Sequence, residues 1–430
     1  MIGAKDRDFI RARMAFYGRH LREDVLSWWL GNAIDEDFGG VYTYWDGAGD
    51  ALTLRTRDKY VWSQGRWGWT TAMLARLGAA RPDLKLDTAR LRRSAVATAE
   101  LLWSGAVLQD GTCASIISRQ GKPIERVPGL GLHDSVYADL FVALAFVGAE
   151  VAAPGHGWAE RALDLAIRAE ARIRKGGVRT EPYPVPAGFD SFALNMILLN
   201  TGAEVFTVTH APEAAAIAER AAFAIRRKFA DGADVCESLP RDPKALGETL
   251  DARHRNPGHV IEGLWMYRQA ADLLPEVAAI DADCNRWLAD VFCHMCGLGW
   301  DEQEGGLLRF VDRDGGPPRG TDRGSVYETV VTSGWDWKLW WPHNEALYAA
   351  LQLFLRTGDP ALGEWYRRLD AYTFSHFPAG PGREWKQILD RKGNPMPPDP
   401  RAALPVKDPY HLLRGLLLLL ELEPELDAHS

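Results

Sequence analysis

Cysteine is scarce in this chain and follows no disulfide framework. The five cysteines among 430 residues make an odd count without regular spacing. Cys293-His294-Met295-Cys296 resembles a metal or redox motif, but no second Cys/His pair lies at zinc spacing. This segment also ends an apolar helical run. We therefore expect free thiols in the core rather than a metal site or disulfides.

Basic runs and long apolar runs are also missing. The formal net charge of −8 and the lack of any Lys/Arg run argue against non-specific nucleic-acid binding. We find no apolar stretch of 18 residues, and the Leu-rich segment 412–422 is interrupted by Arg414. The N-terminal residues, with Lys5-Asp6-Arg7-Asp8, lack the apolar core of a signal peptide. The sequence predicts a cytoplasmic protein without nucleic-acid or membrane partners.

Amphipathic runs with a period of 3.6 residues dominate the chain. Several begin at helix caps such as Asp87-Thr88 and Asp190-Ser191, and the strand-like segments are short and confined to connections. The runs predict twelve helices, at about 6–31, 60–79, 86–105, 134–152, 157–175, 190–205, 211–230, 257–275, 279–298, 335–357, 361–378 and 409–424.

The connections between these helices alternate in length. The links from even to odd helices are short, at 81–86, 153–156, 206–210 and 357–360. The links from odd to even helices are long, and two contain related units: 35–40 leads into 41–49, and 301–306 leads into 307–315, each with Gly-Gly and then Asp-x-x-Gly. Such glycines suit hairpin turns. A helix pair plus a hairpin, repeated six times, predicts an all-α (α/α)6 barrel spanning residues 1–430 as one domain.

In such a barrel the even helices lie inside, and the hairpins gather on one face at their N-terminal ends. We expect function on that face, where loops shape a cleft and helix N-termini offer N–H donors. The alternative architecture is a two-layer helical bundle or solenoid.

Two histidines open even helices in matching settings. His259 has Glu262 one turn later, and His411 has Arg414 one turn later. A single buried histidine is usually a structural hydrogen-bonder, but a matched pair suits a reaction that moves a proton between two faces of a carbon. We interpret both as catalytic. Glu262 would orient His259 or raise its basicity, and Arg414 or Arg66 would stabilise negative charge on a substrate oxygen.

Other polar and aromatic residues cluster near the starts of the even helices. Arg66 lies among apolar residues, either as an ion-pair strut or as a binder of a substrate oxygen. Trp340 and Trp341, with Pro342 disturbing the helix, predict an aromatic wall beside Glu345, which would hold sugar hydroxyls. The alternatives are core packing and, for Asp139, capping of its own helix. The predicted substrate-binding residues are Trp62, Tyr137, Asp139, Asn195, Trp340, Trp341, Glu345 and Arg414.

Four motifs in this order resemble the N-acylglucosamine 2-epimerase family across nearly the whole chain. They are Trp62-x-Gln64-Gly65-Arg66, Asn256-Pro257-Gly258-His259-x-x-Glu262, Trp335-Asp336-x-Lys338-Leu339-Trp340-Trp341-Pro342-His343-x-Glu345-Ala346 and His411-x-x-Arg414. The resemblance implies an (α/α)6 barrel that epimerises sugars at C2 or interconverts aldoses and ketoses. It implies that His259 and His411 are the acid/base pair, that Arg66 binds the carbonyl end, and that the protein forms a homodimer.

The chain departs from parts of that family. Family isomerases and disaccharide epimerases typically carry a histidine on the sixth helix, where this chain has Asn195-Met196, which favours the N-acyl-hexosamine type. Some such members respond to ATP, but no Gly-x-x-x-x-Gly-Lys-Ser/Thr loop occurs here. We expect a sugar 2-epimerase without cofactor or metal, working through a cis-enediolate. The alternatives are an aldose–ketose isomerase of the mannose/fructose type, a glycoside hydrolase and a carbohydrate-binding protein.

Overall fold

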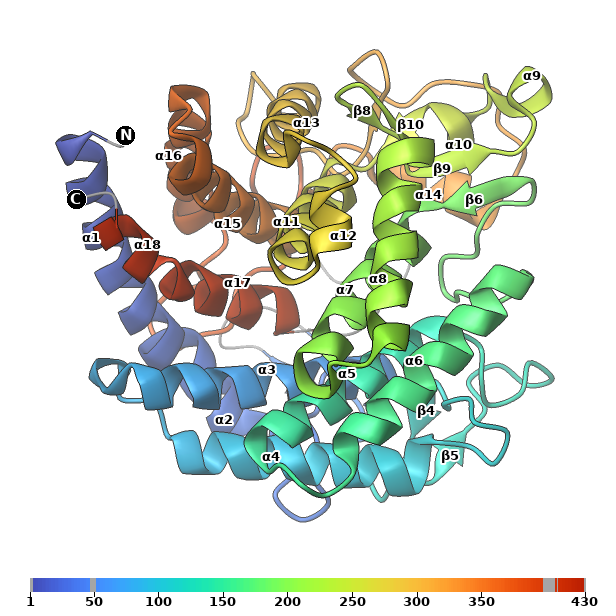
Figure 1. The fold of residues 1–430 in the computed structure, drawn as a ribbon, viewed down its shortest axis with the longest axis vertical. Coiled ribbons are helices and arrows are strands. Elements are labelled where there is room, and N and C mark those ends of the chain that lie inside the picture. The colour runs from blue at the N-terminus through green and yellow to red at the C-terminus, as the bar shows by residue number, and fades with distance from the viewer. Residues whose placement is uncertain (1–2, 47–51, 397–406, 408, 429–430) are drawn as a thin grey trace.

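Six helices form a closed inner ring in the computed structural model, which describes residues 3–46, 52–396, 407 and 409–428. Each helix of the ring contacts the next one in chain order, and the sixth returns to the first (Figure 1). The six are α3 (Val61–Ala80), α5 (Val136–Ala152), α7 (Phe192–Thr209), α11 (Pro257–Leu273), α15 (Trp340–Thr357) and α17 (Tyr410–Glu421).

A second layer of helices surrounds this ring. Three of its members continue into π-helical segments. The outer helices are α1 (Ala4–Arg19) with η1 (His20–Leu26) and α2 (Ser27–Asn32), α4 (Thr88–Leu101) with η4 (Leu102–Ala106), α6 (Trp158–Lys175), α8 (Pro212–Ala224) with η5 (Ile225–Phe229), α13 (Cys284–Gly299) and α16 (Pro360–His376). Each of the twelve predicted runs overlaps one of these helices, and the predicted (α/α)6 barrel is confirmed.

Shorter elements fill the connections. They are η3 (Pro82–Leu84), α9 (Pro243–Leu246), α10 (Leu250–Arg253), α12 (Pro275–Ala278), α14 (Val326–Gly334) and α18 (Glu423–Ala428), with the strands β1 (Trp45–Asp46), β2 (Thr53–Leu54), β3 (Lys59–Tyr60), β4 (Ile116–Ile117), β5 (Pro123–Ile124), β6 (Phe189–Ser191), β7 (Ala230–Asp231), β8 (Asp234–Val235), β9 (Ser238–Pro240), β10 (His254–Arg255), β11 (Val311–Asp312), β12 (Lys338–Leu339) and β13 (Ile388–Leu389).

Burial explains which helices lie inside. Every residue of α17 from Tyr410 to Leu420 is buried, so this helix is enclosed on all sides. The outer helix α6 instead buries one stripe, at Trp158, Ala162, Leu165, Ala166 and Ala169. Small residues let the inner helices approach closely: a Cβ on Gly65 would lie 2.2 Å from the Phe141 carbonyl oxygen. Helix α3 therefore packs on α5 backbone to backbone.

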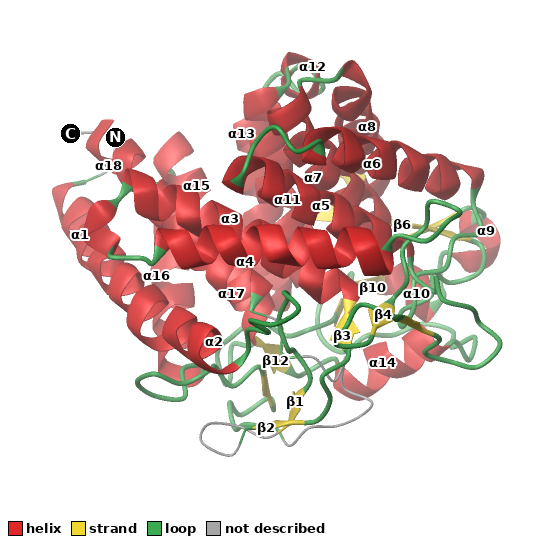
Figure 2. Ribbon diagram, turned by 90° about the horizontal axis from the view of Figure 1, so that it is seen from below, coloured by secondary structure: helices red, strands yellow, loops and turns green. Residues whose placement is uncertain are grey.

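Each inner helix begins beside the long connection that leads to the next inner helix around the ring. The two or three residues before the helix pair with the long link that follows the next outer helix, as β3 with β4, β6 with β9, β10 with β11 and β12 with β13. Ser135 bridges Thr180 before α5, and the Lys407 N–H donates to the Thr43 carbonyl at 2.7 Å before α17. Figure 2 shows the strands gathered along one side of the helices. The connections are thereby tied into one ring at the N-terminal ends of the inner helices.

The two predicted Gly-Gly units form the same turn. The Gly39 N–H donates to the Asp35 carbonyl, and the Gly305 N–H donates to the Asp301 carbonyl, at 2.8 and 2.7 Å. All four glycines have positive φ between 71° and 80°, a conformation that favours glycine. The turn predicted at 46–49 falls largely on residues 47–51, which lie outside the described residues.

The fourth residue of an inner helix holds each of these turns. Gln64 of α3 accepts the Val41 N–H at 2.8 Å through its side-chain oxygen. His343 of α15 accepts the Leu307 N–H at 2.8 Å through Nε2, while its Nδ1–H donates to the Leu339 carbonyl. His343 thus has a structural role as a neutral ring, and burial lowers its pKa to about 3.

Two details differ from the sequence prediction. The run 335–357 is not one helix, because α14 ends at Gly334 and β12 precedes α15, which begins at Trp340. Pro342 therefore lies in the first helical turn, where a proline interrupts no helical hydrogen bond, and the predicted disturbance of the helix is wrong. Within the described residues, α7 is long and apolar enough to cross a membrane, although no such stretch was expected; its 18-residue window is 67% buried in the barrel. The five cysteines are free, as predicted; Cys113, Cys284 and Cys296 are buried in the core, whereas Cys236 and Cys293 are only partly buried.

Candidate active site

A cavity of about 260 Å³ opens at the N-terminal ends of the inner helices. All six inner helices contribute to its wall, and the long connections complete it. The residues of the wall that come from inner helices include Trp62, Arg66, Tyr137, Phe141, Ala193, Met196, Ile197, His259, Glu262, Met266, Trp340, Trp341, Tyr410, His411 and Arg414. Both predicted histidines thus meet at one cavity.

The His259 ring is held by a carboxylate that the sequence did not indicate. Asn256 caps α11 by accepting the His259 backbone N–H at 3.3 Å, which fixes the histidine in the first turn. Its Nδ1 lies 3.0 and 3.1 Å from the two carboxylate oxygens of Glu237, in the segment between β8 and β9. Burial acts to lower the pKa of His259, but the charge of Glu237, its hydrogen bond to the ring and the charge of Glu262 together raise that pKa. Glu237, rather than the predicted Glu262, therefore holds this ring, while Glu262 contributes to the raised pKa.

The His411 ring is held in the same way by Glu345. Nδ1 of His411 lies 2.8 Å from Oε1 of Glu345, which is fully buried and also accepts the indole N–H of Trp265 at 2.8 Å. Glu345 is therefore bound to protein groups and is not among the residues that line the cavity, so the geometry does not support its predicted contact with sugar hydroxyls. Each histidine has its Nδ1 bound to a buried carboxylate, which leaves Nε2 on the far side of the ring.

Arg414 links Glu345 to a second buried carboxylate, Glu262. Its Nη2 donates to Glu345 at 2.7 Å and also to Glu262. The side chain is 1% exposed. Burial opposes its charge, but Glu345 and Glu262 outweigh burial and raise the pKa of Arg414 well above its usual value. Arg414 lines the cavity, and its guanidinium neutralises the carboxylates behind His411.

Glu262, Glu345 and His411 also have the spacing of a metal site. One ligand atom of each lies within 4.8 Å of the other two. The Arg414 guanidinium, however, bonds to both carboxylates and supplies the positive charge there. The donor set fits an ion-paired network better than it fits a cation.

Trp341 brings the two histidines into one wall. The centroids of the His259 and His411 rings each lie 5.3 Å from the Trp341 ring system, with interplanar angles of 36° and 37°. Trp340 contacts only His411 of these two, edge-on at 6.5 Å. The predicted aromatic wall is present, and Trp341 is its centre.

Arg66 faces the cavity from α3, as predicted. Its guanidinium carbon lies 4.3 Å from the Phe141 ring centroid, 5.1 Å from that of Tyr410 and 5.9 Å from that of Trp62. Aromatic faces thus hold this cation at the wall of the cavity next to His411. Tyr137 also lines the cavity.

Asp139 and Asn195 are not among the residues that line the cavity. Asp139 accepts the Cys113 backbone N–H and an Arg172 N–H, both at 2.6 Å, so it fastens a connection to α6. Asn195 donates to the Ser191 carbonyl at 2.9 Å and lies on a separate groove between α6, α7 and α8. Their predicted contact with substrate finds no support in this geometry.

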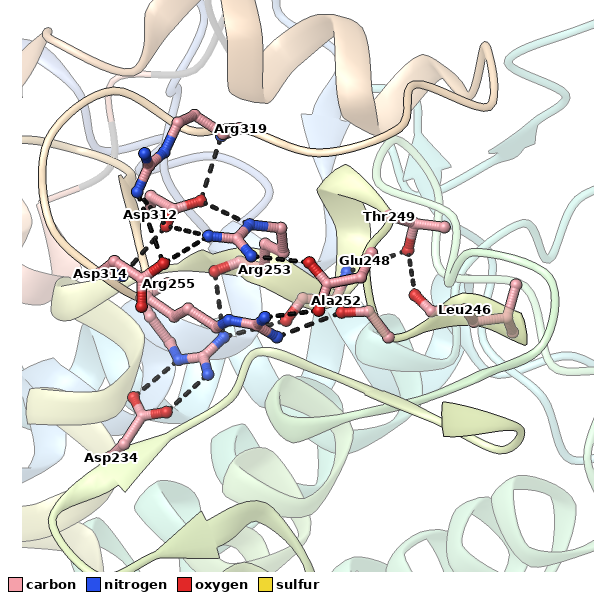
Figure 3. Close-up of polar contacts among 12 residues, drawn as sticks. Asp234, Leu246, Glu248, Thr249, Ala252, Arg253, Arg255, Asp312, Asp314 and Arg319 are labelled. Atoms are coloured by element: carbon pink, nitrogen blue, oxygen red, sulfur yellow. Dashed lines mark hydrogen bonds and ion pairs between the residues drawn. The ribbon is translucent and has the colours of Figure 1, made fainter. Parts of the chain in front are cut away.

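A network of ion pairs fixes the segments that carry the first histidine and its carboxylate (Figure 3). Arg255 of β10 forms a two-point pair with Asp234 of β8, at 2.7 and 2.6 Å. Arg253 forms a similar pair with Asp312 of β11, at 3.0 and 2.8 Å. Such bidentate pairs add geometric precision. Asp234 lies three residues before Glu237, and Arg255 lies four residues before His259. The Arg255–Asp234 pair therefore holds Glu237 and His259 side by side.

A third arginine at the cavity, Arg309, was not predicted from the sequence. Arg309 lies in the connection after α13, three residues beyond the Gly305-Gly306 turn, and is 8% exposed. Its guanidinium carbon lies 4.9 Å from the Phe310 ring centroid and 5.8 Å from that of Trp337. The two related Gly-Gly turns, at 39–40 and 305–306, could have indicated Arg309. The residues that follow each turn belong to a connection that leads to the N-terminal end of an inner helix, where the cavity lies.

Comparison with known proteins agrees with this architecture. The family model for N-acylglucosamine 2-epimerase (GlcNAc 2-epimerase) matches residues 40–414. The N-acylglucosamine 2-epimerase of Bos taurus is 27% identical over 97% of this chain and 93% of its own. The cellobiose 2-epimerase of Spirochaeta thermophila shares the fold with a TM-score of 0.75 at 17% identity, covering 99% of this chain and 100% of its own. A D-mannose isomerase gives 0.70 at 17% identity, covering 98% and 100%.

The family match runs from the first connection to Arg414 near the start of α17, and it contains both histidines and Arg66. It covers more than half of the chain and agrees with the order of the four sequence motifs. The chain belongs to the N-acylglucosamine 2-epimerase family, and it is an enzyme of the epimerase and isomerase class.

Proposed function

We propose that this enzyme epimerises an aldose or N-acyl-hexosamine at C2, with His259 and His411 acting as base and acid on opposite faces of that carbon. One imidazole removes the proton from the ring-opened sugar and gives a cis-enediolate. The other returns a proton from the opposite face, which inverts C2. The name of the Bos taurus relative and the absence of a histidine at Asn195-Met196 favour an N-acyl-hexosamine.

The matched setting of the two imidazoles is the observation that carries the proposal. Each Nδ1 is held by a buried carboxylate, and each ring lies 5.3 Å from the same indole of Trp341. A carboxylate on Nδ1 fixes the tautomer whose Nε2 can accept a proton, and it stabilises the imidazolium that results. Two such groups at one cavity supply one base and one acid in either direction of the reaction.

The enediolate places negative charge on the oxygen of C1, which needs a cationic neighbour. Arg66 is at the cavity wall next to His411, held against aromatic faces. A guanidinium in a desolvated pocket stabilises developing oxyanion charge without reorganising. We assign to Arg66 the binding of the C1 carbonyl end.

The carboxylates of the cavity argue against glycoside hydrolysis. Hydrolysis needs two carboxyl groups that flank the scissile bond and exchange protons with it. Within the described residues, Glu237 is bound to His259, while Glu262 and Glu345 are bound to Arg414. The carboxylates support the imidazoles instead.

Solvent deuterium tests this mechanism directly. N-acetyl-D-glucosamine, D-glucose and D-mannose are each incubated with enzyme in D2O, and proton NMR follows deuterium at C2 and the appearance of the C2 epimer or of a ketose. Deuterium in the product epimer supports the proposal, and formation of a ketose reports return of the proton to C1. Release of a reducing end from oligosaccharides without C2 exchange would replace it with hydrolysis.

Variants that lack one of the two histidines distinguish a two-base mechanism from a one-base mechanism. His259→Asn and His411→Asn should each lose net epimerisation by about 10²–10⁴-fold, because each lacks one proton transfer. Each variant should retain exchange of the C2 proton of one epimer only, and the two variants should retain opposite epimers. Full epimerisation by His411→Asn would disprove the two-base mechanism.

A further inference from the structure

Arg309 is a buried cation at the cavity without a carboxylate among the described residues. The side chain is 8% exposed, and its Nη1 is buried without a hydrogen-bond partner in the part of the chain that the structure describes. A buried charge without compensation is costly, so proteins pair such groups or use them to bind a ligand. The contacts of this guanidinium are with aromatic faces, at Phe310 and Trp337.

The acids that line the cavity are already bound by other cations. The lining residues include three arginines, Arg66, Arg309 and Arg414, but only two glutamates. Glu237 is bound to His259, and Glu262 is bound to Arg414. No lining glutamate is therefore left to pair with Arg309.

Arg309 and Arg66 lie toward different histidines. Arg66 packs on Tyr410, the neighbour of His411. Arg309 is one of the charges that act on His259, and it also acts on Tyr327, a neighbour of Phe310 at the cavity. A ligand that presents its carbonyl end to Arg66 therefore has a second cation available on the His259 side of the cavity.

We propose that Arg309 binds an anionic group carried by the substrate, so that the enzyme acts on a sugar with a carboxylate or phosphate away from C1 and C2. The proposal rests on the proposed C2 chemistry and narrows its substrate class. An anion against Arg309 fills the role that Glu262 and Glu345 fill for Arg414. A charge-assisted contact of this kind also fixes the register of the sugar, which places C2 between the two imidazoles.

The test compares matched neutral and anionic sugars. D-Glucose is paired with D-glucuronate, and N-acetyl-D-glucosamine with its 6-phosphate, and kcat/KM for deuterium exchange at C2 is measured for all four. The wild type should prefer the anionic member of at least one pair by about 10- to 100-fold, the range expected of a charged hydrogen bond. The glucuronate pair reports a carboxylate, and the other pair reports a phosphate.

Two substitutions at Arg309 and a control locate the effect. Arg309→Met should abolish the preference, because exchange of the anionic sugars should fall by more than exchange of the neutral sugars, while Arg309→Lys should keep part of the preference. Arg319→Met is the control, because Arg319 is a 58% exposed cation of the same connection that does not line the cavity. A wild type without preference, or an equal loss for neutral and anionic sugars in Arg309→Met, would overturn the proposal.

Thermal stabilisation keeps this test separate from the C2 chemistry. The shift in Tm with each sugar is measured for the wild type and Arg309→Met, a readout that needs no turnover. Larger shifts with the anionic sugars in the wild type alone support the anion site even if none of the four sugars exchanges deuterium, a result that would count against the proposed epimerisation. Equal shifts with neutral and anionic sugars, or with both proteins, count against the anion site.

Discussion

Glu237→Gln removes the charge behind His259 and keeps the shape of the side chain. Glu237 is 4% exposed, and both of its oxygens lie within 3.1 Å of Nδ1 of His259. The amide of glutamine can donate to Nδ1 and so favours the tautomer with the proton on Nε2, which cannot act as a base. We expect a loss in kcat of about 10²–10⁴-fold, the contribution of one acid–base group.

The same substitution should shift the pH dependence of the enzyme. Burial and Arg309 both lower the pKa of His259, and Glu237 is the main group that raises it. Without that charge the pKa of His259 falls, so the limb of the pH–kcat profile that reports His259 moves to lower pH. The profile is measured for exchange in D2O with the sugar that the wild type prefers.

The contribution of the Glu237–His259 pair to stability depends on pH in a defined direction. Because the folded pKa of His259 is raised above its ordinary value of 6.5, the stabilisation is fully present below that pH and is lost as pH rises through the folded pKa. Glu237→Gln should therefore lower the free energy of unfolding by about 1.5–3 kcal/mol near pH 6 and by less near pH 9. Chemical denaturation at the two pH values measures this difference.

A matched control tests whether loss of any buried glutamate has the same effect. Glu170 is also buried and paired, with Arg220 at 2.7 Å, but it lies away from the cavity. Glu170→Gln should leave kcat and its pH profile unchanged. Wild-type kcat in Glu237→Gln, or an equal loss in Glu170→Gln, would refute the assignment of Glu237.

Three further predictions concern the frame of the site. Gly306→Ala should lower the free energy of unfolding by about 1–3 kcal/mol, because φ is 80° and a Cβ would lie 2.5 Å from the Tyr372 ring; thermal denaturation measures it, and unchanged stability would contradict it. His343→Gln should keep more stability in urea than His343→Ala, since Gln64 holds the related turn, and equal losses would contradict that equivalence. Burial raises the pKa of Asp251 to about 7, and both of its carboxylate oxygens lack hydrogen-bond partners among the described residues. Ionising this carboxyl therefore destabilises the folded wild type as pH rises from 3.8, its ordinary pKa, through 7. The free energy of unfolding of Asp251→Asn, measured relative to the wild type, should be higher at pH 8 than at pH 5. Parallel curves of unfolding free energy against pH for the two proteins would contradict this.

The helices and their order could be predicted because a 3.6-residue pattern is a local property of the chain. The same holds for the two helix-opening histidines. The partner of His259 could not be predicted, because Glu237 reaches it from a connection 22 residues earlier. The i+3 spacing pointed to Glu262, which does line the cavity, but Arg414 arrives from α17 and binds it.

Helix rotation explains which substrate-binding predictions are not supported. Successive residues turn by about 100° around a helix, so small errors in phase exchange one face for another. On α5, Tyr137 and Phe141 line the cavity, and Asp139 lies between them in sequence on the opposite face. On α7, Met196 lines the cavity and the adjacent Asn195 faces the groove between outer helices. Sequence alone gives the periodicity, whereas the phase depends on packing against neighbouring helices.

The ring of strand pairings has no first or last member. The segment before α17 pairs with the connection before α3, so Lys407 and Thr43 close the ring as the other pairings continue it. The outer helix α1 also contacts α18 near the end of the described chain. A circularly permuted chain, with α1 joined to α18 and new ends in the short link 153–157, would retain all six pairings. In such a protein the cavity would be assembled from the same side chains in a different chain order.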